Sequence, residues 1–286
     1  MSEKKYLILT VVFIFLSVIA GISYVFIKNS QQPLQLAENT ETADGAQALE
    51  NCNDDTLYDW DSMDKALEKP DSVCKLDISK HDVTEVVADV FQFPNLEVLI
   101  AENNLIESIP DQLETLTKLK SVDLSNNKLQ EFPPVLLRMP NLQYLDLGGN
   151  QIAAIPAGIS SLTNLYKLDM KENLITEVPA EIGSLTSLET LELSYNNINL
   201  VSADIGNLTA LWELFLGDNS LSALPSELGN LSNLKVFYLS NNQFTSVPEV
   251  IKAMSGLVEL HLEGNPLNQD DVSALKNSLP GAQVTF

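Results

Sequence analysis

The apolar positions of the chain recur every 23 residues from Val73 onward. Each segment reads apolar-x-x-apolar-x-apolar-x-x-Asn-x-apolar, and its second half usually reads apolar-Pro-x-x-apolar-x-x-apolar. The apolar-x-apolar step is typical of a strand that buries alternate side chains. One segment buries too little apolar surface to fold alone, so stacked segments that share interfaces are expected. The nine segments begin at Val73, Leu96, Leu119, Leu142, Leu165, Leu188, Leu211, Leu234 and Leu257.

The pattern is complete at 142–152, which reads LQYLDLGGNQI. Over 73–267 it resembles the leucine-rich repeat. The 23-residue length and the mid-repeat proline are similar to Ras-suppressor and plant Ras-group repeats, and to repeat proteins of bacterial envelopes. The resemblance implies an α/β solenoid of about nine repeats, with a parallel sheet on its concave face and helical caps at both ends.

A few positions depart from this pattern. Ala101, Met170 and Phe237 stand at core positions that are usually leucine. Ser202 and Val87 stand where neighbouring repeats have proline. We expect local changes of shape at these positions and no change of fold.

An asparagine recurs at one position of eight segments. Its amide can satisfy backbone groups where the chain leaves the strand, which predicts a buried structural ladder; contact with a ligand is the alternative. His81 occupies the same position in the first segment and is expected to substitute for a ladder asparagine. The ladder asparagines are Asn104, Asn127, Asn150, Asn173, Asn196, Asn219, Asn242 and Asn265.

The open ends of a solenoid need covering. Residues 52–72 are amphipathic, with Asp61 or Ser62 as a helix start and Pro70 beyond the helix end, which predicts an N-terminal cap. Residues 268–286 predict a C-terminal cap made of a helix, a turn and a last strand. No effector domain is expected beyond it, so any output is expected to come from what the solenoid binds.

The chain has two cysteines, and they flank the N-terminal cap. Cys52 and Cys74 are predicted to form one disulfide in an oxidising compartment, where the bond would restrict the unfolded chain. Two free buried thiols are the alternative.

The 22 residues from Tyr6 to Ile27 carry no charge, which is enough to cross a bilayer. Two lysines ahead of them favour a cytoplasmic N-terminus and an extracytoplasmic repeat domain. Residues 1–28 therefore predict a cytoplasmic stub and a transmembrane signal anchor in the cytoplasmic membrane. A signal peptide cleaved after Ala20, which would release a secreted protein, is the alternative. The polar, acidic residues 29–51 predict a flexible linker.

The charge balance excludes several functions. The chain has 16 Lys and Arg and 39 Asp and Glu, which gives a net charge of −23. Such acidity argues against nucleic-acid binding and against docking of the repeats on anionic lipid, because both rely on basic side chains. Two His and two Cys leave little for a metal or a nucleophile–base pair, and no phosphate loop, zinc spacing or nucleophile elbow occurs along the repeats. No enzymatic activity, cofactor or metal is expected.

The central outward position of four successive strands predicts a column of carboxylates. Neighbouring strands lie about 4.8 Å apart, and like charges at that distance repel by about 1–3 kcal/mol. A cationic or metal-bearing ligand would relieve this repulsion; a solvated face screened by salt is the alternative. Retaining glycosidases use a similar carboxyl spacing, but an open face is not expected to raise a pKa for catalysis. The column is Asp123, Asp146, Asp169 and Glu192.

Aromatic side chains follow on the later strands. Exposed aromatic residues beside acidic ones are typical of interface hot spots; sideways packing that covers the sheet is the alternative. The candidate partner-binding residues are therefore the four carboxylates above together with Tyr144, Tyr195, Trp212, Phe215, Tyr238 and His261.

These features predict a non-enzymatic module that binds a protein or peptide through its concave face, outside the cytoplasmic membrane. The expected partner carries a basic and apolar stripe and lies across repeats three to eight. A structural or adhesive envelope protein that contacts glycans or other surface polymers is the alternative. The oligomeric state does not follow from the sequence.

Overall fold

The structure is a computed structural model that describes residues 57–286. The predicted anchor or signal peptide (1–28), the predicted linker (29–51) and Cys52 lie outside the described residues, so these predictions and the Cys52–Cys74 bond stay predictions. Among the described residues, none of the helices has the length and apolar character needed to cross a bilayer.

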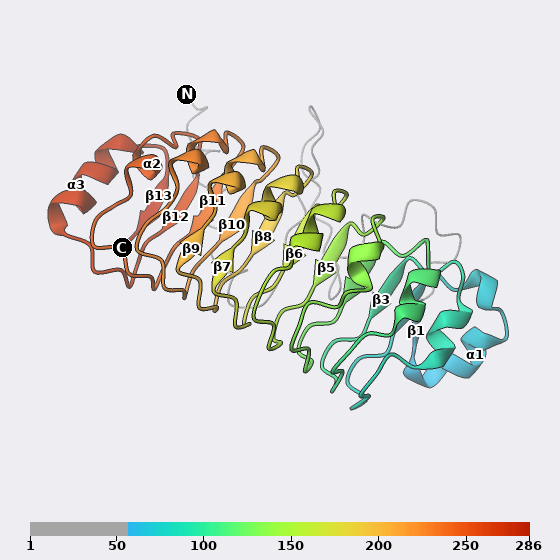
Figure 1. The fold of residues 1–286 in the computed structure, drawn as a ribbon. Coiled ribbons are helices and arrows are strands. Elements are labelled where there is room, and N and C mark those ends of the chain that lie inside the picture. Colours follow the sequence, from blue (N-terminus) through green and yellow to red (C-terminus); the bar gives the residue numbers. More distant parts are fainter. Residues whose placement is uncertain (1–56) are drawn as a thin grey trace, which may run out of the picture. The chain divides into compact units, whose positions relative to one another are not determined.

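Eleven parallel strands form one sheet whose order follows the sequence (Figure 1). Nine of them, β2 to β6, β8 and β10 to β12, occupy the third to fifth residues of the nine 23-residue segments. The strands are β1 (Leu57–Asp59), β2 (Lys75–Asp77), β3 (Val98–Ile100), β4 (Ser121–Asp123), β5 (Tyr144–Asp146), β6 (Lys167–Asp169), β8 (Thr190–Glu192), β10 (Glu213–Phe215), β11 (Val236–Tyr238), β12 (Glu259–His261) and β13 (Gln283–Thr285).

The core lies between this sheet and the returning half of each repeat. Because side chains alternate along a strand, the middle residue of each strand points inward, as fully buried Leu145 does in β5. Ala101, Met170 and Phe237, which replace leucine, are also fully buried. The changes in size at these three positions are therefore absorbed within one continuous core.

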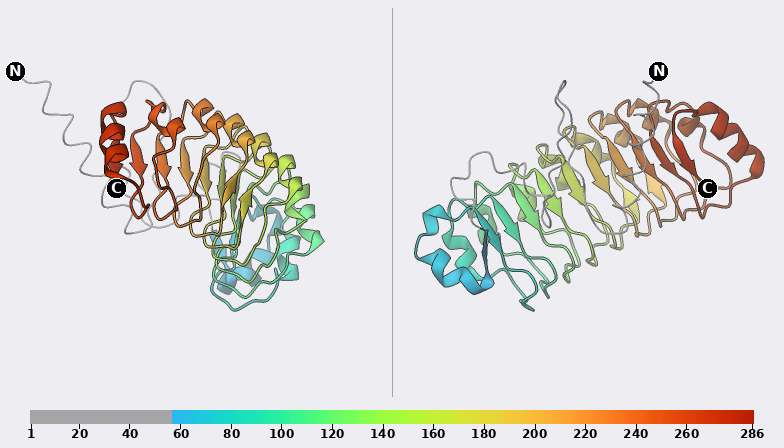
Figure 2. Two further views of the ribbon diagram at one scale, coloured as in Figure 1. Left: turned by 60° about the vertical axis from the view of Figure 1, so that its left-hand side comes forward. Right: turned by 180° about the vertical axis from the view of Figure 1, so that it is seen from behind.

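Short helices form the outer side of the arc and the sheet its inner side (Figure 2). A proline precedes many of them, where its missing N–H leaves no helical bond unmade. Those of the repeats are η5 (Ala88–Gln92), η6 (Asp111–Thr115), η7 (Leu136–Arg138), η8 (Ala157–Ser161), η9 (Ala180–Ser184), η10 (Ala203–Asn207), η11 (Ser226–Asn230) and the α-helix α2 (Glu249–Lys252).

The recurring asparagines form the predicted structural ladder. Asn150 Nδ2 donates to the carbonyls of Leu124 and Leu147, each at 3.0 Å, and to that of Gly148 at 3.2 Å. Its Oδ1 accepts from the Leu129 N–H at 3.0 Å. The same side chain thus ties its own turn to the preceding repeat, and the arrangement recurs along the solenoid, for example at Asn242.

The prediction for His81 holds only in part. Its side chain is exposed and stacks on Trp60, with ring centroids 5.0 Å apart. Its Nδ1 contacts the Ser79 carbonyl in its own turn, as a ladder asparagine does, and its backbone N–H donates to Asn104 Oδ1 at 3.0 Å. A ring without an amide group cannot supply the donors and acceptor that the ladder position requires.

Each end of the sheet carries additional elements. Before β2 lie β1, η3 (Trp60–Ser62), α1 (Met63–Leu67) and η4 (Pro70–Ser72). The strand β1 pairs with β2, so the sheet begins one strand before the first predicted one. After β12, helix α3 (Gln269–Ser278) is capped by Asn268, whose side chain accepts from the Asp271 N–H, and β13 closes the sheet.

The departure at Ser202 has a structural consequence. Unlike proline, serine keeps its backbone N–H, which donates to the Val178 carbonyl at 3.0 Å. Two short strands, β7 (Glu177–Val178) and β9 (Leu200–Val201), pair here in a second small parallel sheet. The predicted local change of shape is thereby explained.

Candidate functional site

The carboxylates Asp123, Asp146, Asp169 and Glu192, named here the acid stack, face one another across four neighbouring strands in register. Each is tied to its own turn by a backbone N–H two residues further on. Asp146 Oδ1 accepts from Gly148 at 2.8 Å, and Asp169 Oδ1 accepts from Lys171 at 3.0 Å. The carboxylates are therefore fixed in place as well as aligned.

The two middle members of the acid stack are buried, and Asp123 and Glu192 at its ends are half-buried. Asp146 and Asp169 are 9% and 5% exposed. Burial, reinforced by the neighbouring charge of Asp146, raises the pKa of Asp123 to about 7 and that of Asp169 to about 8. Burial also raises the pKa values of Asp146 and Glu192. The solvated-face interpretation is therefore wrong for Asp146 and Asp169, and the raised pKa values run against the expectation that an open face raises no carboxyl pKa.

Side chains on either side of the acid stack contact it. Tyr144 is buried, and its hydroxyl donates to Asp146 Oδ2 at 3.2 Å. Lys167 Nζ lies 5.2 Å from the Tyr144 ring centroid, and Lys171 Nζ lies 3.7 Å from Asp169 Oδ2. The prediction that Tyr144 is an exposed aromatic is wrong, because the ring packs sideways over the sheet.

A buried ion pair lies beside the strands that precede the acid stack. Lys120 Nζ lies 2.9 Å from Glu97 Oε2, and both side chains are largely buried, at 22% and 6% exposed. An ion pair with so little solvent depends on both partners, since either charge alone would be poorly solvated. The first half of the concave face therefore satisfies much of its own charge.

A different arrangement follows on β10 to β12. Phe215, Tyr238 and His261, named here the ring stack, occupy the central outward position of three strands in register. The Phe215 and Tyr238 centroids are 5.0 Å apart, and those of Tyr238 and His261 are 3.9 Å apart with nearly parallel planes. All three are half-buried. The ring stack thus both covers the sheet, as the alternative interpretation held, and presents ring edges to solvent.

His261 is anchored at the end of the ring stack. Its Nδ1 lies 3.0 Å from Thr285 Oγ1, and Thr285 Oγ1 also donates to Glu263. Its Nε2 lies 3.8 Å from Glu259 Oε2. The C-terminal strand β13 therefore fixes the last ring.

The repeats that hold the ring stack, and the repeat before them, also carry large exposed side chains. Trp212 is 43% exposed, Tyr195 is 56% exposed and Val258 is 50% exposed. Tyr195 has a φ of 56°, a left-handed conformation that is unfavourable for a bulky residue. This turn holds the tyrosine outward, where the charge of Asp218 raises the pKa of its hydroxyl.

Sequence reasoning missed three glutamates near the ring stack. Glu213 and Glu259 occupy the outward position two residues before the rings, and Glu263 follows β12. Burial and the charges of Glu259, Glu263 and Glu213 raise the pKa of Tyr238 to about 12. Glu213 and Glu259 could have been found by comparing the third residue of each 23-residue segment.

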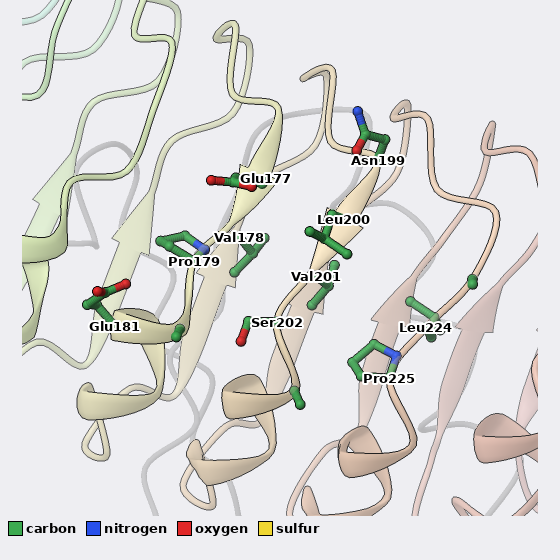
Figure 3. Close-up of a pocket in the computed structure, with 13 residues that line it drawn as sticks. Glu177, Val178, Pro179, Glu181, Asn199, Leu200, Val201, Ser202, Leu224 and Pro225 are labelled. Atoms are coloured by element: carbon green, nitrogen blue, oxygen red, sulfur yellow. The ribbon is translucent and has the colours of Figure 1, made fainter.

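A hollow of about 650 Å³ lies away from the main sheet (Figure 3). It lies along β7 and β9, where Pro179, Leu200, Ser202 and Pro225 line it. It contains none of the predicted partner-binding residues. Among the described residues, no group of three or more His, Cys, Asp or Glu side chains is arranged to hold a metal ion.

Comparison with known families identifies the repeat. A model described as a leucine-rich repeat region matches residues 75–217, half of the chain, and a second leucine rich repeat model matches 211–267. The chain therefore belongs to the leucine-rich repeat proteins, and the predicted resemblance is confirmed. No curated protein matches the sequence well enough to count as a relative.

Solved structures share the fold. A leucine-rich repeat protein of Leptospira interrogans is 30% identical, with a TM-score of 0.67 over 76% of this chain and 61% of that one. Internalin C2 of Listeria monocytogenes is 28% identical, with a TM-score of 0.60 over 69% of this chain and 82% of that one. The plant peptide hormone receptor RGFR1, in complex with RGF2, is 23% identical, with a TM-score of 0.62 over 76% and 36%. This chain thus spans less than two thirds of the Leptospira protein and of the plant receptor.

Proposed function

We propose that this protein is a non-enzymatic binding module that recognises a protein or peptide through its concave face. Proteins of this fold include a peptide hormone receptor seen in complex with RGF2, so the fold is compatible with polypeptide recognition. The observation that carries the proposal is the exposure of two large aromatic side chains, Trp212 and Tyr195, in the repeat that holds Phe215 of the ring stack and in the repeat before it. Large rings that remain exposed on a rigid sheet are typical of interface anchors.

The partner is expected to have a basic and apolar surface. The chain has a net charge of −23, and carboxylates flank the exposed rings. A basic partner would be attracted over long range and would suffer no like-charge repulsion at contact. The candidate contact area is the second half of the concave face, because Tyr144, Asp146 and Asp169 are too buried to offer much contact surface. The proposed contact area is therefore smaller than the predicted one, which spanned repeats three to eight.

We further propose that the repeats lie outside the cytoplasmic membrane, held by the predicted signal anchor at 1–28. Protease treatment of intact cells tests this location. Digestion of the repeats without cell lysis is expected, and complete protection until lysis would contradict it.

Alanine substitution tests the contact area. The Trp212→Ala/Phe215→Ala double variant is expected to lose most partner capture in cross-linking from native cells, because both rings belong to the proposed interface. Leu174→Ala/Leu200→Ala removes two side chains that are 49% and 57% exposed outside the outward positions of the main sheet, and should capture normally. Equal capture by both double variants would contradict the proposal. Saturable binding to purified wall polysaccharide, with no polypeptide captured, would favour the adhesive alternative.

A further inference from the structure

The outward column beside the ring stack holds two glutamates with a short apolar residue between them. Glu213, Val236 and Glu259 lie side by side on β10, β11 and β12. With strands about 4.8 Å apart, the two glutamate backbones are about 10 Å apart across the valine. All three residues are partly exposed, and Glu213 Oε2 accepts from Thr190 Oγ1 at 3.0 Å. The Glu213 carboxylate is thus directed toward β8, and Val236 is an apolar position between two strands that each carry a glutamate.

Tyr238 lies two residues along β11 on the same face as Val236. The charges of both glutamates and of Glu263 act on its hydroxyl. Lys235, which precedes Val236, is directed elsewhere, since its Nζ donates to the Gly256 carbonyl at 3.0 Å and lies 5.8 Å from the Trp212 ring centroid. Glu259 Oε2 lies 3.8 Å from His261 Nε2. Negative potential therefore gathers beside an apolar surface.

The same column differs in the first half of the solenoid. From β2 to β6 it reads Lys75, Val98, Ser121, Tyr144 and Lys167, with no carboxylate. Acidic side chains enter this column only at β10 and β12. The acidic character of this column is therefore local to the ring stack rather than a property of the repeat.

We propose that a lysine or arginine side chain of the partner lies between Glu213 and Glu259 over Val236, with a neighbouring apolar side chain of the partner on the edges of the ring stack. Tyr238 has a ring on each side, so its edge is the part available for apolar contact, and the two carboxylates supply the complementary charge. This inference rests on the proposed function and specifies what the binding face recognises.

Three synthetic twelve-residue peptides test the inference with the full chain at low salt: alternating Lys-Leu, alternating Glu-Leu and alternating Lys-Ser. Binding is followed by isothermal titration calorimetry. The Lys-Leu peptide should bind at least about tenfold more tightly than either of the others, because it alone supplies both charge and apolar contact. Equal binding of Glu-Leu and Lys-Leu would overturn the inference.

A matched pair of variants separates local recognition from general attraction to an acidic protein. Glu213→Gln/Glu259→Gln should weaken Lys-Leu binding about five- to tenfold, as expected for the loss of two partly exposed ion pairs. Glu107→Gln/Glu131→Gln removes the same charge at exposed positions outside the sheet and should change binding less than about twofold. Equal effects of the two pairs, or no Lys-Leu binding by the wild-type chain, would overturn the inference. A natural partner still captured through Trp212 and Phe215 would leave the proposed function standing.

Discussion

The two halves of the concave face are built from the same repeat but carry different side chains. On β2 to β6 several charges on or beside the strands are paired within the chain, as in the Glu97–Lys120 pair and the Lys171–Asp169 pair. On β10 to β12 the central outward positions carry stacked rings, and glutamates lie in the next column. A constant backbone therefore supports one stretch with paired or buried charges and another with partly exposed rings, which we propose to be the binding surface.

The largest effect is expected where the two halves are alike. Asn150→Ala in the first half and Asn242→Ala in the second each leave several buried backbone groups without a partner, so each should lower the free energy of unfolding by about 2–4 kcal/mol. Urea denaturation followed by circular dichroism measures the loss. Gln151→Ala and Gln243→Ala change the exposed residue that follows each asparagine and serve as controls. A loss in one half only would mean that the halves already differ in their scaffold.

A smaller, unequal effect is expected for two lysines at the same position of their repeats. Lys120→Met leaves Glu97 buried without its cation and should lower the free energy of unfolding by about 2 kcal/mol. The Lys235 ammonium donates to the Gly256 carbonyl and lies near the Trp212 ring. Lys235→Met should therefore lower the free energy of unfolding by less than about 1 kcal/mol. The comparison uses thermal unfolding at one pH and salt concentration. Equal losses would remove the distinction between a self-paired half and a half suited to a partner.

The smallest effect concerns pH. The folded pKa values of about 7 for Asp123 and about 8 for Asp169 lie above the ordinary value of 3.8. The folded state therefore binds protons more tightly than the unfolded state, and this contribution to stability is fully present below about pH 4 and lost as pH rises to about 8. Asp169→Asn removes one such carboxyl and should raise the free energy of unfolding at pH 9 by about 1–2 kcal/mol relative to wild type.

The control for the pH measurement is Glu177→Gln, which changes an exposed carboxylate on β7. It should leave the slope of stability against pH close to that of wild type. A wild-type protein whose stability rose steadily from pH 5 to pH 8 would contradict the buried acid stack.

The sequence predicted the repeat, the strand positions and the asparagine ladder because each follows from local periodicity. The 23-residue interval places Leu145 inward and Asp146 outward without any long-range information. The extra strand β1 escaped prediction because its residues, Leu57 to Asp59, lack the repeat pattern and pair only through the adjacent β2. The His81 prediction failed in part because it considered only the position in the repeat. An imidazole ring lacks the amide group that an asparagine supplies there.

The candidate site was only partly predictable. Position in the repeat identified both the acid stack and the ring stack, since register alone aligns them. Burial did not follow from register, and Tyr144, Asp146 and Asp169 are buried although their strand positions face away from the core. Neighbouring side chains decide how much water reaches such a position, and that depends on packing across several strands at once. Glu213 and Glu259 were missed because only the central column was read for charge.

Photo-cross-linking from one repeat position in each half tests the central claim most directly. A benzoylphenylalanine placed at Trp212 or at the partly exposed Gln143, which occupy the same position of their repeats, is activated in native cells, and cross-linked polypeptides are identified by mass spectrometry. We expect one saturable polypeptide from position 212 and little or none from position 143. Equal yields from both positions, or a partner reached only from position 143, would contradict binding through the second half of the concave face.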